Sequence, residues 1–140
     1  DEIAISVGGI AALKVEEASN ATKVTINETL ELNGKVLDIA LDLRKNSPTF
    51  GKYETVILSG ENKKQFFIPR GFAHAFLVLS ETATFSYKVD NWYAPEYEAG
   101  IHWNDNKLNI HWEIDQKEVV VSERDSKLPK FSEFQSPFTK

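Results

Sequence analysis

The stretch of residues 34–51 reads GKVLDIALDLRKNSPTFG and contains the clearest secondary-structure pattern of the chain. Its side chains point alternately to two sides from residue 36 onward, which is the period of a half-buried β-strand. One side carries Val36, Asp38, Ala40 and Asp42, and the other carries Leu37, Ile39, Leu41 and Leu43. The strand is expected to end at Arg44-Lys45, because Asn46-Ser47-Pro48 supplies turn-forming residues.

More short strands are predicted after this one. Runs rich in β-branched and aromatic residues cover 53–59, 65–69, 72–80 and 82–89, and Ser80-Glu81 is a candidate hairpin turn. A helical period is almost absent, and the tail from Ser126 is expected to pack as an irregular arm. Short strands separated by turns predict an all-β fold, a barrel or jelly roll with little helix.

The first 33 residues have a different composition from the rest. No aromatic residue precedes Phe50, and residues 1–33 hold six acids against two lysines. Apolar residues at even positions over 24–32 give a weak strand signal, and Gly8-Gly9 marks a turn. A length of 140 residues fits one domain, so a single domain over 1–140 is expected.

The composition excludes several classes of protein. Hydrophobic residues make up 41% and charged residues 26%, which is typical of globular domains. No apolar run is long enough to span a membrane, and a net charge of −5 argues against nucleic acid as a partner. The absence of cysteine excludes disulfides and thiolate metal sites and fits the cytoplasm.

Three blocks of sequence resemble one known family. The first is residues 34–51, the second is LSGENKKQFFIPRGFAHAF over 58–76, and the third is YKVDNWYAPEYE over 87–98, followed by GIHWND over 100–105 and SERD over 122–125. In order and spacing they resemble the dTDP-4-dehydrorhamnose 3,5-epimerases over about residues 34–138. These are cofactor-free sugar-nucleotide isomerases on a cupin-type β-barrel, so the resemblance implies a cupin-type fold.

The resemblance implies inversion of C3 and C5 in a dTDP-4-keto-6-deoxyhexose, a step of dTDP-L-rhamnose-type biosynthesis. The C4 ketone acidifies the protons on both carbons. Inversion then takes a base on one face, an acid on the other and donors that stabilise the enolate between the two steps. Neither a cofactor nor a metal is implied, and the family suggests a homodimer.

The resemblance also assigns roles to individual residues. Tyr87 would be the acid, since a phenol is protonated at neutral pH, and Asp125 would orient the catalytic histidine. His74, Glu98 and Arg124 would bind substrate, with the Arg124 guanidinium suited to a phosphate. Taken without the motifs, Tyr87 is a rim tyrosine, His74 a core or loop histidine, and the two charged residues are solvated surface groups.

Other aromatic and histidine residues are less specific. Trp92 and Tyr93 offer flat faces for a base or sugar, but core packing explains them equally well. His102 and His111 lie in two Ile-His-Trp triplets, and no His-x-His pair of the kind that cupin metals require is present. No metal site is therefore expected.

Residues 1–33 are atypical for the family. The Arg-Gly-Leu-His-x-Gln segment that carries the family's catalytic histidine would fall near Glu17, and nothing there matches it. Three interpretations remain open. Glu16 or Glu17 replaces the base, the protein is a catalytically impaired member that acts as a sugar-nucleotide-binding or structural cupin module, or the N-terminal sequence does not represent that of a normal epimerase. Asp125 would then lack its histidine and would need either another partner or exposure to water.

Overall fold

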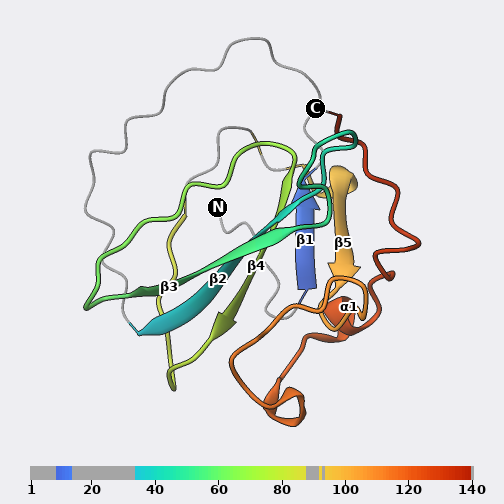
Figure 1. The fold of residues 1–140 in the computed structure, drawn as a ribbon. Coiled ribbons are helices and arrows are strands. Elements are labelled where there is room, and N and C mark those ends of the chain that lie inside the picture. The colour runs from blue at the N-terminus through green and yellow to red at the C-terminus, as the bar shows by residue number, and fades with distance from the viewer. Residues whose placement is uncertain (1–8, 14–33, 88–91, 93, 140) are drawn as a thin grey trace.

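The chain folds around one antiparallel β-sheet, seen in the computed structural model (Figure 1), which describes residues 9–13, 34–87, 92 and 94–139. Five strands lie in the order β3-β2-β4-β1-β5. Their bounds are Gly9–Leu13 for β1, Lys35–Asp42 for β2, Tyr53–Ser59 for β3, Phe72–Val78 for β4 and Glu98–His102 for β5.

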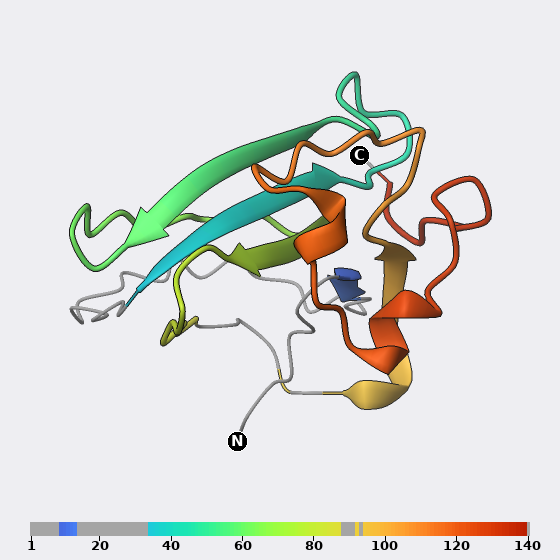
Figure 2. The same cartoon turned by 90° about the horizontal axis from the view of Figure 1, so that it is seen from below.

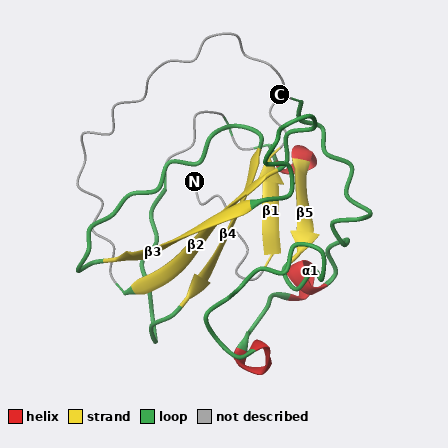
Figure 3. Ribbon diagram, in the orientation of Figure 1, coloured by secondary structure: helices red, strands yellow, loops and turns green. Residues whose placement is uncertain are grey.

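Helix is scarce in the described residues, as Figure 3 shows. The short helix α1 covers Glu123–Ser126, and two 3-10 turns cover Pro95–Tyr97 and Gln116–Glu118. None of these helices exceeds four residues, so none of them could cross a bilayer. Figure 2 shows α1 beside β5, with which it is in contact.

The strand predicted after Gly34 is present as β2, but the expectation that it is half-buried is wrong. Every residue of β2 after Lys35 is buried, on both faces. The Leu37 face packs in the main core, whose buried members are Leu37, Ile39, Leu41, Leu43, Ala73, Ala75, Leu77, Ile101, Leu108, Ile110 and Trp112. The opposite face packs in a smaller cluster of Val36, Leu58 and Phe76, and its aspartates are buried because they have hydrogen-bond partners.

The predictions for 53–59 and for most of 72–80 are confirmed as β3 and β4. The structure assigns no strand to residues 65–69 or to 82–87, the described part of the predicted strand 82–89. Residues 65–69 run without strand pairing, since Pro69 has no N–H to donate and no described strand lies alongside. Within 82–87 only Thr84 makes a bridge, and Phe85 is fixed instead by stacking on Phe76 at 4.7 Å between ring centroids. The weak strand signal over 24–32 lies outside the described residues.

Strand β1 was not predicted, and it joins the two halves of the sheet. It pairs with β4 at Ala11–His74 and with β5 along its whole length, from Gly9–His102 to Leu13–Glu98. Gly9 therefore begins a strand rather than belonging to a turn. The sequence GIAAL has no polar residue and so no alternating pattern, and this strand forms between two neighbouring strands rather than from a signal of its own.

The predicted irregular arm after residue 126 is confirmed and closes the molecule. It runs beside β5 and returns to the turn after β2 (Figure 1), where Lys45 bridges Thr139 and the Lys45 N–H donates to the Phe138 carbonyl at 2.9 Å. Phe131, Phe134 and Phe138 pack against the main core. The arm thus covers the Leu37 face and leaves the Asp38 face for the candidate site.

Candidate active site

His74 and Asp38 form a buried hydrogen-bonded pair in the middle of the sheet. His74 Nε2 lies 2.5 Å from Asp38 Oδ1, and the side chains are 18% and 3% exposed. The pairing of β2 with β4 brings them together, since Ala40 faces His74 and Asp38 faces Phe76. The same carboxylate oxygen accepts the Ile39 N–H at 3.0 Å, so Asp38 is held in place as well.

Asp38 belongs to the candidate site, and the sequence interpretation missed it. Its alternation with apolar residues resembled that of a solvated strand face. One signal pointed the other way: both aspartates of β2 share their face with Val36 and Ala40, so that face is not uniformly polar. A buried carboxylate needs a partner, and His74 provides it.

His74, Phe76, Phe85 and Tyr87 form a row of contacting rings, which is called the wall of the candidate site. Tyr87 and His74 both contact Phe85 in this row. The Phe85 ring centroid is 6.0 Å from that of His74 and 6.0 Å from that of Tyr87. Phe76 stacks on Phe85 and fixes this row from the sheet side. The predicted acid and the predicted substrate-binding histidine therefore both contact the ring of Phe85.

Glu98 and Arg124, the two charged candidates, form an ion pair that links β5 to α1. Arg124 Nη2 donates to Glu98 Oε2, with 54% of the arginine side chain exposed and 12% of the glutamate side chain. In the sheet, Ala11 of β1 pairs with His74 of β4 on one side and with Gly100 of β5 on the other. Glu98 is two residues before Gly100 in β5. Glu98 thus points to the same face of the sheet as His74, across β1.

Asp125 is buried, with 1% of its surface exposed, so of the two alternatives the one with another partner holds and exposure to water does not. Its Oδ2 accepts the Ser122 hydroxyl at 2.6 Å, and Ser122 in turn caps α1 by accepting the Asp125 N–H at 3.1 Å. The other oxygen, Oδ1, has no partner among the described residues. A buried carboxylate oxygen without a donor is costly, so this position suits a further donor.

The remaining histidines lie apart from this site. His102 stacks on Trp103, and its Nδ1 accepts the Asn104 N–H at 3.2 Å. His111 is 80% exposed and 3.9 Å from Glu113. Across the ranges that the structure describes, no three His, Asp or Glu side chains gather in a way that could hold a metal. Trp92 is 93% exposed, and Tyr93 lies outside the described residues.

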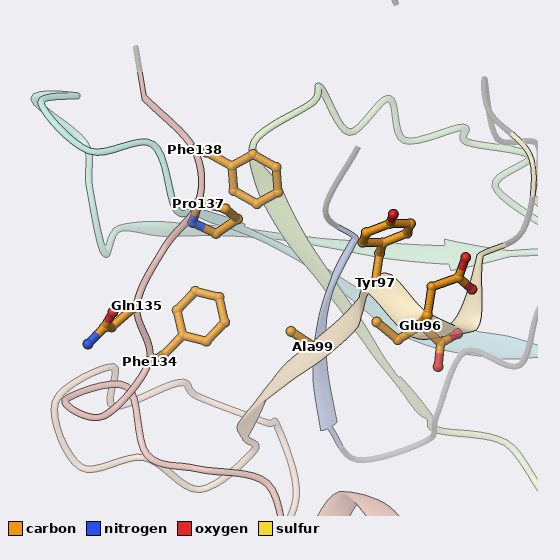
Figure 4. A pocket seen from close by; sticks show the side chains of 8 residues that line it. Glu96, Tyr97, Ala99, Phe134, Gln135, Pro137 and Phe138 are labelled. Atoms are coloured by element: carbon orange, nitrogen blue, oxygen red, sulfur yellow. The ribbon is translucent and has the colours of Figure 1, made fainter. Parts of the chain in front are cut away.

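An open pocket of about 490 Å³ lies between β5 and the C-terminal arm (Figure 4). It is lined by Glu96, Tyr97, Glu98, Ala99, Phe134, Gln135, Pro137 and Phe138. It shares Glu98 with the candidate site but contains neither His74 nor Tyr87. This hollow is therefore distinct from the wall that carries the predicted acid.

One hydrogen-bonded network near these residues serves the fold. Asp42, 1% exposed, accepts hydrogen bonds from the Arg44 guanidinium and from the hydroxyls of Ser47 and Thr49. The hydrogen bond from the Arg44 side chain lowers the pKa of Asp42 well below its usual 3.8. Burial acts in the opposite direction, and the hydroxyls of Ser47 and Thr49 lower the pKa further. These residues belong to the most specific block of the resemblance, and they fix the turn after β2.

Comparison with known proteins identifies the family. The family model for dTDP-4-dehydrorhamnose 3,5-epimerase matches residues 17–133. The epimerase of Shigella flexneri is 49% identical over 98 residues, which are 70% of this chain and 53% of that protein. The epimerase of Pseudomonas aeruginosa is 52% identical over 92 residues, 66% of this chain and 50% of that protein. The chain thus spans about half the length of the curated relatives it matches.

Solved structures agree with the sequence comparison. The epimerase of Elizabethkingia anophelis has a TM-score of 0.74 at 42% identity, covering 91% of this chain and 68% of its own. The dTDP-6-deoxy-D-glucose-3,5-epimerase of Legionella pneumophila, in complex with dTDP-4-keto-L-rhamnose, has a TM-score of 0.77 at 35% identity, covering 96% and 71%. These neighbours have the cupin-type fold, which confirms the predicted all-β fold class. The chain belongs to the dTDP-4-dehydrorhamnose 3,5-epimerase family.

Proposed function

We propose that this chain inverts C3 and C5 of a dTDP-4-keto-6-deoxyhexose. The observation that supports this best is the shared wall of His74 and Tyr87 in a chain of this family. The Legionella relative was solved with dTDP-4-keto-L-rhamnose, a sugar nucleotide of the class proposed here. The single domain is proposed to cover residues 1–140.

The chemistry at this wall is proton removal and return beside a ketone. Loss of the C3 or C5 proton leaves an enolate, and Tyr87 gives a proton to the opposite face of the same carbon. The stacked Phe76 and Phe85 rings make this part of the site apolar, and a hydrogen bond to the enolate oxygen is stronger beside an apolar surface than in water. Asp125 would support the group that removes the proton.

The binding roles follow from charge. Arg124 is half exposed and presents a planar fork of donors, which suits an oxygen of the diphosphate. Its partner Glu98 is largely buried and fixes the direction of the guanidinium, so the positive group is oriented before the ligand arrives. His74 would contact the sugar from the centre of the sheet.

The second candidate is a sugar-nucleotide-binding module without turnover. One observation favours it: Asp125 Oδ1 has no hydrogen-bond donor in the described part of the chain, although the resemblance implies a histidine at that point. A module of this kind would keep the charged pair for binding and lose the exchange of protons.

One experiment separates the two candidates. The chain is incubated with dTDP-4-keto-6-deoxyglucose in deuterated buffer, and the C3 and C5 proton signals are followed by NMR. Loss of both signals is expected, because each inversion passes through an enolate that takes up deuterium. Shifts of the ligand signals without exchange would favour the binding module.

The role of Tyr87 is tested in the same assay. Tyr87→Phe removes only the hydroxyl, so it should slow epimerisation at one or both centres by about 100-fold or more while dTDP still binds. Tyr97→Phe, in the separate pocket beside the C-terminal arm, is the matched control and should leave the rate unchanged. Full double epimerisation by Tyr87→Phe would show that the assignment is wrong.

The assembly and compartment are part of the proposal. The family suggests a homodimer, and the lack of cysteine fits the reducing cytoplasm. Light scattering would give twice the chain mass of 15.8 kDa for a dimer and that mass itself for a monomer.

A further inference from the structure

The wall of the candidate site has an apolar centre and two polar ends. Phe76 and Phe85 stack with 4.7 Å between their ring centroids and 25° between their planes. The His74 ring lies 6.2 Å from Phe76 and 6.0 Å from Phe85, and the Tyr87 ring lies 6.0 Å from Phe85. Among these contacts Phe85 is the apolar ring that meets both polar ones.

Phe85 is only partly enclosed by the apolar cluster behind it. Phe76 is 7% exposed and forms that cluster with Val36 and Leu58, whereas Phe85 is half-buried and packs against it. The other partly buried side chains that pack there are also apolar, namely Val56, Phe66, Val78 and Ala83. A ligand group that lies against the accessible part of Phe85 therefore meets carbon on that side.

The proposed reaction places a substituent of the sugar close to Phe85. A proton passes from the Tyr87 hydroxyl to the reacting carbon within hydrogen-bond reach, which is about 3 Å. The groups on that carbon are one bond further away, so they come within contact distance of the ring that borders Tyr87. C5 carries C6, which is a methyl group in a 6-deoxyhexose and a hydroxymethyl group in the corresponding hexose.

The surroundings of Phe85 favour the methyl group. A methyl group against a phenyl ring gives up only its contact with water, which is favourable. The hydroxyl of a hydroxymethyl group would give up hydrogen bonds to water and gain none from Phe76 or Phe85. The polar ends of the wall are occupied, since Tyr87 serves the reacting carbon and Nε2 of His74 is bound to Asp38.

We propose that Phe85, backed by Phe76, is the residue that selects 6-deoxy sugars at this site, an assignment that rests on the proposed function. Its ring contacts C6 while C5 is inverted and makes a hydroxyl on C6 unfavourable. Phe85 is a specificity-determining residue and transfers no proton. The binding roles of Arg124 and His74 concern other parts of the ligand.

The experiment compares two substrates that differ by one hydroxyl, dTDP-4-keto-6-deoxyglucose and dTDP-4-ketoglucose. Deuterium exchange at C5 is followed by NMR, and kcat/KM is measured for each substrate with the same protein sample. The wild-type chain should prefer the 6-deoxy sugar by about 100-fold, which is the discrimination that an apolar pocket achieves against an added hydroxyl. A ratio of two kcat/KM values does not depend on the folded fraction of the sample, so a folding defect cannot imitate the result.

Three variants separate recognition from packing. Phe85→Asn and Phe85→Tyr offer the C6 hydroxyl a hydrogen-bond partner, and Phe85→Tyr also keeps the ring that stacks on Phe76. Both should reduce the preference to less than about 10-fold, because the hydroxyl is then no longer left without a partner. Phe85→Leu keeps the surface apolar and should retain most of the preference. Phe67→Asn, at a phenylalanine that is 82% exposed, is the matched control and should retain all of it.

The outcomes distinguish this inference from the proposed function. Equal kcat/KM values of the wild-type chain for the two substrates overturn the inference and leave the proposed function standing. An unchanged preference in Phe85→Asn or in Phe85→Tyr does the same, because the ring would then serve packing alone. A wild-type chain that binds dTDP but exchanges neither C3 nor C5 of the 6-deoxy sugar overturns the proposed function, and this inference with it.

Discussion

Among single residues, four buried carboxylates stand out, and each accepts hydrogen bonds from nearby donors. Asp38, Asp42, Asp105 and Asp125 are each at least nine-tenths buried. Asp105 shows how a carboxylate stays charged: burial alone would raise its pKa, but backbone N–H groups of Phe131, Leu108 and Lys107 outweigh burial and lower the pKa. Asp38 and Asp105 each join two distant segments of the chain, through His74 and the Phe131 N–H, whereas Asp42 and Asp125 hold local turns.

Asp42→Asn should lower the free energy of unfolding at pH 7 by about 3 kcal/mol, because it leaves Arg44 without its buried partner. The pKa of Asp42 is depressed in the folded chain, so its contribution is present above the ordinary value of 3.8 and is lost as the pH falls below it. Urea unfolding at pH 7 and pH 3 should therefore show a gap between variant and wild type that narrows at the lower pH. Exposed Glu81→Gln is the control, and a gap equal at both pH values would contradict the argument.

Most residues of the candidate site were predicted from sequence motifs. One of them, Asp38, is recognised only from the pairing of β2 with β4. Tyr87, His74, Glu98, Arg124 and Asp125 were predicted because each lies in a specific block of sequence. Asp38 was not predicted as a site residue, since the sequence does not show that β4 places a histidine beside it. Asp38 and His74 are 36 residues apart in the sequence, and the register of β2 against β4 brings them together. This register cannot be read from one sequence alone.

At the scale of elements, the predicted strands are those with their own alternating pattern. Strands β2, β3 and β4 have β-branched or alternating apolar residues and were predicted. Strand β1 has no polar residue and therefore no alternation, and it forms between β4 and β5, with both of which it pairs. The reverse holds for residues 65–69, whose pattern suits a strand but which have no partner among the described residues.

The start of β2 gives a prediction at this scale. Gly34 has φ +91°, and a Cβ there would lie 2.3 Å from the Thr82 carbonyl oxygen, which belongs to the backbone and cannot move aside. Gly34→Ala should cost about 3 kcal/mol of stability. Gly51 is the matched control, because its φ is +75° but its Cβ would meet only a Phe131 ring atom at 3.3 Å, and Gly51→Ala should cost about 1 kcal/mol. Chemical denaturation of both variants measures the difference, and equal costs would refute the backbone clash.

In the molecule as a whole, the C-terminal arm covers one face of the sheet, and the candidate site lies on the other. The arm is fastened at its start by the Phe131 N–H to Asp105 at 2.9 Å and at its end by Ser136, whose hydroxyl donates to the Leu43 carbonyl. Between these points its phenylalanines cover the core formed by β2, β4 and β5. The sequence predicted an irregular arm, but not that its phenylalanines complete the core.

If the C-terminal arm is part of the core, removing the aromatic ring of Phe138, its last aromatic residue, should lower the free energy of unfolding. Phe138 packs on the core, and a Cβ placed on Gly71 would lie 3.7 Å from the Phe138 Cβ. Phe138→Ala should lower the free energy of unfolding by about 2 kcal/mol, which is less than for a phenylalanine that is fully buried. Phe67 is 82% exposed, so Phe67→Ala removes the same atoms from a solvated position and should change stability by no more than about 0.5 kcal/mol. Thermal and urea unfolding of the two variants compare them directly. Equal effects would mean that the arm lies on the sheet without contributing to the core, and the closed face would then need another explanation.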